Sequence, residues 1–151
     1  MVRIWATLAP MDCTQSDTEE LIRIYYEAFN TGDRSAMLRL LTEDVVHDIN
    51  QGDSVPGAAA FAQFLDHMDR CYVEQVEDLA VMVDATGSRA AAEFFIRGEY
   101  RTTDEGLPEA AGQKYHLRVG AFFEIAGGRI ARVTNYYNLQ DWIRQVGGGS
   151  L

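Results

Sequence analysis

The sequence predicts an α+β fold, a cone-shaped α+β barrel. Its N-terminal helices should pack on the concave face of a curved mixed or antiparallel sheet and enclose a pocket. Residues 16–68 repeat apolar side chains mainly at helical spacing, whereas residues 72–138 are typical of long consecutive strands. Helices that precede a β meander specify two packed layers, and long strands curl through their right-handed twist. Because short helices cannot fill so wide a sheet, we expect a cavity between the layers.

The composition indicates one globular domain and excludes several classes of partner. The chain has 151 residues and a formal charge of −10, from 23 acidic against 13 basic residues. Nucleic acids and anionic lipids are recognised by clustered cations, which such a chain lacks. It also has no apolar run of about 18 residues, the length that a membrane-spanning helix needs. We therefore expect a cytoplasmic protein with no nucleic-acid partner and no membrane partner.

The chain divides into a domain and two tails. We expect an N-terminal tail over residues 1–15, in which Met11 is an alternative start, and a single domain over residues 16–146. The glycine-rich residues 147–151 should form a flexible C-terminal tail. No linker or internal repeat divides the domain itself.

Helical signals fill the first part of the domain. Ser16 and Glu19 fit a capping box at a helix start. Gly32 and Asp33 suit the end of that helix and the start of a second one. Residues 45–50 favour a short strand, and residues 51–56 a loop. A third helix follows, with apolar side chains at i, i+3, i+4 and i+7. These side chains are Phe61, Phe64, Leu65 and Met68.

Strand signals fill the second part of the domain. We expect four long strands over residues 72–83, 89–101, 113–125 and 129–138. Residues 102–112 should form a loop, and the glycines in residues 126–128 favour a tight hairpin turn. Residues 140–146 are consistent with a closing helical turn.

Alternation along the strands sorts side chains into two faces. Val46, Asp48 and Asn50 share one side of the first strand, opposite Val45, His47 and Ile49. In the last strand, Asn135 and Tyr137 lie on the same side as Val133. The charged side of residues 89–101, which carries Arg97 and Glu99, should face water unless a bulge turns its last residues inward. His116 and Gly120 share one side of residues 113–125.

Several segments in order resemble one family. The segments 25–33 (YYEAFNTGD) and 41–48 (LTEDVVHD) are similar to the opening of ketosteroid isomerases. Residues 119–125 (VGAFFEI) continue the match, and residues 133–142 (VTNYYNLQDW) are similar to the last strand of limonene epoxide hydrolase and SnoaL-type proteins. Together they resemble the SnoaL-like and ketosteroid isomerase-related family within the nuclear transport factor 2-like superfamily, over residues 17–146. The resemblance implies a pocket fold and, commonly, a homodimer.

The resemblance to the isomerases implies roles for particular residues. Asp48 stands where they carry the general base, and Tyr25 where they carry a phenol that donates to a developing enolate oxygen. Gly120 stands where they carry a second acid, so half of that oxyanion hole is missing. A carboxylate shut in an apolar cavity gains basicity through loss of hydration, which suits removal of a proton from carbon.

The resemblance to limonene epoxide hydrolase implies a second set. Arg97 and Glu99 stand where that enzyme carries an arginine and its first aspartate, and Asn135 replaces the remaining aspartate. We therefore expect Asp48, Tyr25 and Asn135 to be catalytic. The residues expected to bind substrate are Val46, Asn50, Arg97, Glu99, His116, Gly120 and Tyr137. His47 is left out, because by alternation it faces away from Asp48.

No cofactor or metal is expected. The histidines His47, His67 and His116 show no ligand spacing, and Cys13 and Cys71 are too few for a zinc site or a disulfide framework. The expected function is that of a cofactor-independent isomerase, hydratase, cyclase or epoxide hydrolase, with a buried carboxylate as base and a small apolar substrate. The alternative is a non-catalytic binding protein for a small hydrophobic ligand. A homodimer that pairs through the face carrying Phe95 is compatible with either.

Overall fold

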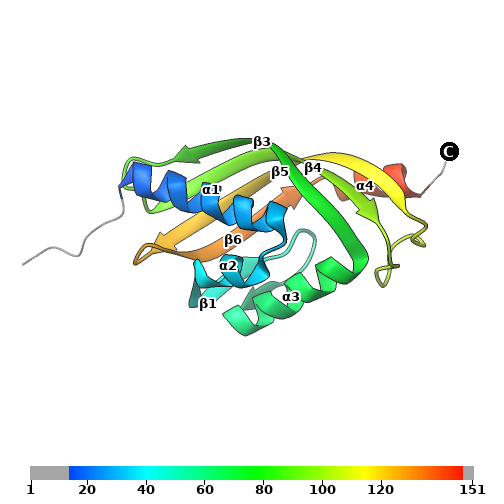
Figure 1. Cartoon of the computed structure of the whole chain (residues 1–151), viewed down its shortest axis with the longest axis horizontal. Coiled ribbons are helices and arrows are strands. Elements are labelled where there is room, and N and C mark those ends of the chain that lie inside the picture. The colour runs from blue at the N-terminus through cyan, green and yellow to red at the C-terminus, as the bar shows by residue number, and fades with distance from the viewer. Residues whose placement is uncertain (1–13, 148–151) are drawn as a thin grey trace, which may run out of the picture.

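A computed structural model describes residues 14–147 and confirms the α+β fold (Figure 1). The elements follow in the order α1 (Gln15–Thr31), α2 (Arg34–Arg39), β1 (Leu41–Asp48), β2 (Ser54–Pro56), α3 (Ala58–Cys71), β3 (Tyr72–Val83), β4 (Arg89–Tyr100), β5 (Gln113–Ala126), β6 (Arg129–Tyr137) and α4 (Leu139–Val146). The expected tails, 1–15 and 147–151, lie almost wholly outside the described residues. Within those residues no helix is long and apolar enough to cross a membrane.

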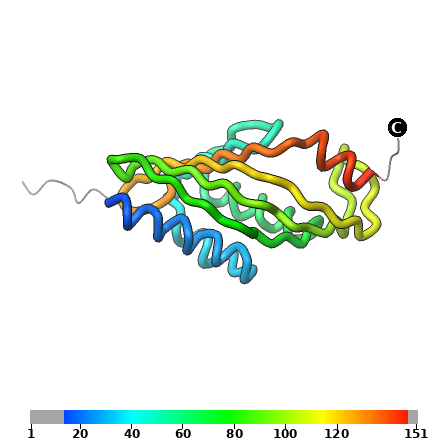
Figure 2. Tube along the Cα trace, turned by 90° about the horizontal axis from the view of Figure 1, so that it is seen from above, coloured from blue at the N-terminus to red at the C-terminus, as the bar shows by residue number. Residues whose placement is uncertain are grey.

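The six strands form one curved, open sheet in the order β2-β1-β6-β5-β4-β3. Strands β3 to β6 pair antiparallel as a meander, whereas β1 pairs parallel with β6, so the sheet is mixed. Helices α1, α2 and α3 lie on one side of the sheet, and α4 lies at the end of β6 (Figure 2). The sheet therefore curls round the helices as a cone, as the sequence predicts.

The first helix begins earlier than the sequence analysis expects. Thr14, not Ser16, is the N-cap, and its hydroxyl accepts a hydrogen bond from the backbone N–H of Asp17 at 3.1 Å. The Asp17 carboxylate accepts one in return from the N–H of Thr14 at 3.2 Å. The capping pattern occurs twice within residues 14–19, and the earlier copy satisfies the helix terminus. The predicted end is confirmed, because Gly32 caps the helix in the left-handed conformation.

The first strand is longer than expected, and the predicted loop after it contains a strand. β1 extends from Leu41 to Asp48, and β2 pairs with its last residues between Ser54 and Pro56. A register shift in the pairing of β1 with β6 separates Leu41 from Val46. The irregularity hides the period-2 alternation on which the sequence prediction depended.

Side-chain hydrogen bonds fasten α1 to the sheet at both of its ends. Near the start, the hydroxyl of buried Thr18 donates to the carbonyl of Gly87, in the turn between β3 and β4, at 2.6 Å. Near the end, the amide of Asn30 donates to the carbonyl of Val76 at 3.0 Å and accepts from its N–H at 2.7 Å. The Asn30 side chain thus continues the backbone pairing of β3.

A bulge bends β3 and leaves β4 regular. The register of β3 against β4 shifts between Glu77 and Ala80, and Asp78 in that interval has a φ of 52°. Strand β4 alternates strictly between outward and buried positions along its whole length. The bulge is therefore in the neighbouring strand β3 and does not turn Arg97 inward. The charged side of β4 faces water, as its alternation predicts.

Close packing between β4 and β5 depends on one glycine. A Cβ atom at Gly98 would overlap the ring of Tyr115, which crosses the strand at that point. The space left by the missing side chain allows the buried Tyr115 to lie flat against β4 and reach β3. Gly120, further along β5, has no atom within 4 Å of the corresponding position.

We predict that Gly98→Ala lowers the free energy of unfolding by about 1–3 kcal/mol, because the added methyl group overpacks a filled site. Urea denaturation of the variant and the parent chain measures the difference. Gly120→Ala is the matched control on the facing strand, and its stability should stay within about 0.5 kcal/mol of the parent. Equal stabilities for the two variants would contradict this account of Tyr115.

Candidate active site

A cavity of about 440 Å³ lies between the helices and the concave face of the sheet. Its wall carries many aromatic rings, among them those of Tyr26, Phe29, Phe61, Phe64, Phe94 and Trp142. Three lining residues, Gln51, Glu105 and Tyr137, are exposed and mark the mouth of the cavity, between the β1–β2 loop, the β4–β5 loop and the end of β6. A cavity of this size suits a small organic ligand.

Asp48 lies outside the cavity, so its expected enclosure is wrong. Its carboxylate accepts hydrogen bonds from Ser54 Oγ, Thr134 Oγ1 and Arg132 Nη1, each at 2.6 Å, on the convex face of the sheet. These bonds, first those from Ser54 and Thr134, lower the pKa of Asp48 to about 2. The alternation along β1 was correct, but the sides were exchanged. The apolar side with Val45 is the one that faces inward.

His47 takes the place in the cavity that was expected for Asp48. The imidazole is buried between the rings of Phe61 and Phe64, at centroid distances of 4.7 and 4.5 Å. Burial lowers the pKa of His47 from 6.5 to about 4, so the ring is neutral near pH 7. Its Nε2 lies 3.4 Å from the amide nitrogen of Asn135, which lines the cavity from β6. The pair offers a ligand both a donor and an acceptor.

Tyr25 lines the cavity from α1, as expected. Its ring packs edge-on against Tyr26 and Phe123, and burial raises the pKa of its hydroxyl, which therefore stays protonated. Among residues 14–147 the hydroxyl has no hydrogen-bond partner. A phenol on the wall of a cavity is available to donate to a ligand.

Asn50 and Tyr137 also line the cavity, near its mouth. The Asn50 carbonyl oxygen accepts from the N–H of Tyr137 at 3.3 Å. Alternation placed Asn50 on the same side as Asp48. It reaches the cavity because β1 ends at Asp48 and the chain turns at Gln51, which has a φ of 58°.

The remaining expected substrate contacts lie outside the cavity. They are Val46, Arg97, Glu99, His116 and Gly120. Arg97 forms an ion pair with Glu77, and His116 stacks on Phe95 at a centroid distance of 4.7 Å. Because β4 and β5 are regular here, burial of their apolar side requires the polar side to face water.

Glu74 is a carboxylate in the cavity that was not predicted from the sequence. It lies on β3 between the inward-facing Tyr72 and Val76, and its Oε1 accepts a hydrogen bond of 2.6 Å from the hydroxyl of Tyr115. Burial raises the pKa of Glu74, although this hydrogen bond and the charge of Arg34 oppose the change. Alternation with its two apolar neighbours was the signal that could have identified it.

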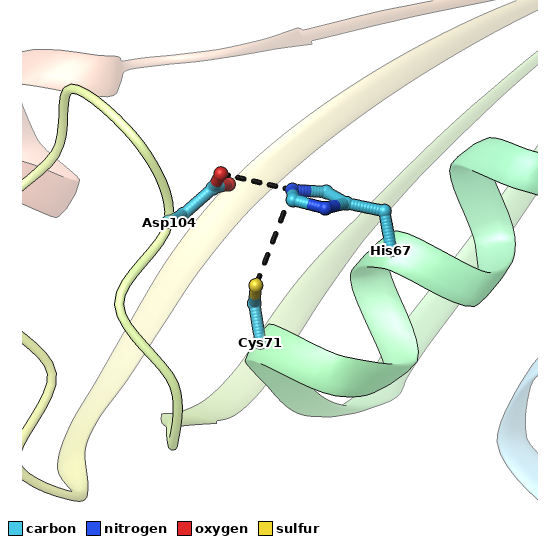
Figure 3. Close-up of side chains that lie close together, drawn as sticks. All are labelled: His67, Cys71 and Asp104. Carbon is cyan, nitrogen blue, oxygen red and sulfur yellow. Dashed lines mark hydrogen bonds and ion pairs between the residues drawn. The ribbon is translucent and has the colours of Figure 1, made fainter.

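Three potential metal ligands meet beside the mouth of the cavity (Figure 3). His67 and Cys71 lie one turn apart on α3, and Asp104 comes from the β4–β5 loop. His67 Nε2 lies 2.8 Å from Asp104 Oδ1 and 4.0 Å from Cys71 Sγ. The i, i+4 spacing of the first two on a predicted helix was visible in the sequence, but the loop residue was not.

Comparisons with known proteins agree with the fold. The model of the SnoaL-like domain matches residues 22–133. A proposed polyketide cyclase of Pseudomonas putida is 59% identical over 85% of this chain and 97% of that chain, with a TM-score of 0.85. One of Xanthomonas campestris is 53% identical over 87% and 97%, with a TM-score of 0.84.

A more distant structure is alike in fold alone. It is an LEH-like epoxide hydrolase of M. tuberculosis, 16% identical over 89% of this chain and 92% of that chain, with a TM-score of 0.71. A comparison with curated proteins gave no match.

We predict that Asp48→Asn lowers the free energy of unfolding by about 1–3 kcal/mol, because the three donors lose a charged acceptor. Affinity for any ligand of the cavity should be unchanged. Urea denaturation and a ligand titration measure the two quantities. Asp44→Asn, at an exposed position of the same strand, is the matched control and should be neutral. Unaltered stability combined with lost function would contradict the structural role.

We predict that His47 makes stability depend on pH. Since its pKa falls from 6.5 to about 4 on folding, the unfolded chain binds the proton first, and stability decreases as the pH falls through this window. The contribution lost between pH 7 and pH 4.5 is about 2–3 kcal/mol. Urea denaturation of the parent chain and of His47→Gln at both pH values isolates it, because the opposite contribution of Glu74 cancels in the difference.

His116→Gln is the control for this measurement, since its exposed ring lies on the outer face of β5. It should keep the pH dependence of the parent chain. If the parent and His47→Gln instead lose stability in parallel, the imidazole is not held neutral by burial.

Proposed function

The chain belongs to the SnoaL-like family, and on this premise we propose that it is an enzyme that transfers a proton on a small, mainly apolar organic molecule. The description of the two relatives above 50% identity as proposed polyketide cyclases supports a carbonyl substrate. A cytoplasmic location, a hydrophobic ligand and a homodimer remain predictions.

The observation that carries the proposal is the position of Glu74. Its carboxylate lines a cavity whose wall is aromatic, and burial raises its pKa toward the range in which a base works near neutral pH. The Tyr115 hydroxyl donates a hydrogen bond to Oε1 of Glu74, which leaves Oε2 free to accept a proton from a substrate. The buried carboxylate base expected from the sequence is thus retained as a role, with Glu74 in place of Asp48.

Neutral donors would hold the substrate oxygen. The Tyr25 hydroxyl is protonated and unpartnered within the described residues, and the amide of Asn135 lies beside neutral His47. Hydrogen bonds from such groups stabilise an enolate oxygen in a site of low polarity, because they need not reorient as charge develops. Loss of one such donor typically costs about 10²–10³ in rate.

A carboxylate base and neutral hydrogen-bond donors suit the ring closure of a compound with two carbonyl groups. Glu74 would remove a proton from the carbon beside one carbonyl, and the enolate oxygen would accept hydrogen bonds from the neutral donors. The enolate carbon would then attack the second carbonyl, and a carbon–carbon bond would form as the carbonyl π bond becomes an alkoxide. Glu74 would return its proton to that alkoxide, so the carboxylate is regenerated.

We predict that Glu74→Gln lowers kcat about 10²–10⁴-fold, because the amide cannot accept the proton. KM should change little, since the amide keeps the size and polarity of the side chain. The probe is a synthetic polyketide-type chain of alternating carbonyl groups, and its cyclised product is followed by liquid chromatography and mass spectrometry.

Glu77→Gln, three residues along the strand on the outer face, is the matched control and should keep the parent rate. Full activity of Glu74→Gln would remove this residue from the base role. If the probe binds the parent chain without any turnover above the uncatalysed rate, the chain is a binding protein and the enzyme proposal is wrong.

A further inference from the structure

We propose that His67, Cys71 and Asp104 form a three-ligand site for a divalent transition metal, with zinc preferred, in the wall of the cavity. The three residues supply an imidazole nitrogen, a sulfur and a carboxylate oxygen, the donor types that zinc takes in proteins. All three donor atoms lie within 4.8 Å of one another. The proposal is independent of the proton-transfer chemistry proposed above.

Two of the three donor separations are close to those that a tetrahedral ion requires. Zinc bonds of about 2.0–2.3 Å place neighbouring donors about 3.4–3.6 Å apart. His67 Nε2 lies 2.8 Å from Asp104 Oδ1 and 4.0 Å from Cys71 Sγ. These two separations differ from the tetrahedral values by about 0.6 Å or less. The donor atoms of the third pair, Asp104 and Cys71, lie within 4.8 Å of each other, and side-chain rotations would complete the geometry. Coordination replaces the thiol proton of Cys71, and that proton passes to solvent.

The backbone holds the ligands together before a metal binds. His67 and Cys71 occupy the last two turns of α3, so their side chains project to the same side. The carbonyl of Cys71 accepts a hydrogen bond of 2.8 Å from the N–H of Arg101, which fixes the start of the β4–β5 loop on the helix end. Further along that loop, the N–H of Asp104 donates to the hydroxyl of Tyr100 at 2.8 Å.

A partner orients the carboxylate ligand. The hydroxyl of Tyr72 donates to Asp104 Oδ2 at 2.7 Å, which leaves Oδ1 directed at His67 (Figure 3). Ligand carboxylates in metal sites are commonly fixed by such a hydrogen bond. On the far side of the imidazole, Arg70 Nη2 lies 3.5 Å from Nδ1, so the guanidinium is not between the three donors.

The fourth position would face the cavity. His67 and Asp104 both line it, whereas Cys71 is 3% exposed and is not part of the lining. Three protein ligands and one open position are the arrangement of catalytic rather than structural zinc sites. A metal here could take a water molecule or the oxygen atom of a ligand that enters through the mouth.

The test uses the full chain, reduced and freed of metal, and a titration with Co²⁺ followed by visible and ultraviolet absorption. We expect one equivalent to bind with the bands of a four-coordinate ion and a thiolate-to-cobalt charge-transfer band, and Zn²⁺ to displace it. Cys71→Ser should abolish the charge-transfer band. His67→Gln and Asp104→Asn should weaken affinity at least about tenfold, and Tyr72→Phe about tenfold through the orienting hydroxyl.

Two matched controls complete the test. Cys13→Ser should keep the charge-transfer band, and His116→Gln should keep the affinity. Circular dichroism of each variant confirms that it is folded. The proposal is overturned if no stoichiometric binding occurs, if the band persists in Cys71→Ser, or if it disappears in Cys13→Ser. In those cases His67 and Asp104 are an ordinary hydrogen-bonded pair. Because no substrate is present, the result does not depend on whether Glu74 is the catalytic base.

Discussion

The parallel pairing of β1 with β6 decides which polar groups the cavity contains. Cα partners His47–Val133 and Asp48–Thr134 set the register, and the Asp48 carboxylate fixes it through Arg132, Thr134 and Ser54 on the convex face. A shift of one residue would exchange every side chain between the two faces. It would carry a charged aspartate into the aromatic interior and expose a histidine that now lies between two phenylalanine rings.

Desolvation shifts the pKa values of several groups that line the cavity. Burial disfavours the charged form of any group, so it lowers the pKa of His47 and raises those of Glu74 and Tyr25. The pKa values shift in opposite directions, but burial is the main cause of each shift. The hydrogen-bonding groups among the rings can orient a small molecule that carries a few oxygen atoms.

The sequence was sufficient for the architecture and insufficient for the inward face. Caps, alternation and turn residues predict the helices and the meander, and the family resemblance is confirmed. The alternation of Asp48 with His47 was also correct. What failed was the choice of side, because it followed an alignment rather than the apolar character of Val45 and Ile49. Arg97 and His116 were also expected to bind substrate, although the opposite, apolar side of their strands is the one that must be buried. Asp104 could not be predicted, since only tertiary packing brings a loop residue to α3.

The attachment of α1 has a kinetic consequence. Asn30 exchanges two hydrogen bonds with the peptide group of Val76, and Thr18 binds the turn at Gly87. Both ends of the helix are held, so we expect this wall of the cavity to move little. Opening of the mouth should then require only rotations of side chains at the rim, such as Gln51 and Glu105, which take picoseconds to nanoseconds. Slow collective displacement of a helix is not needed for exchange.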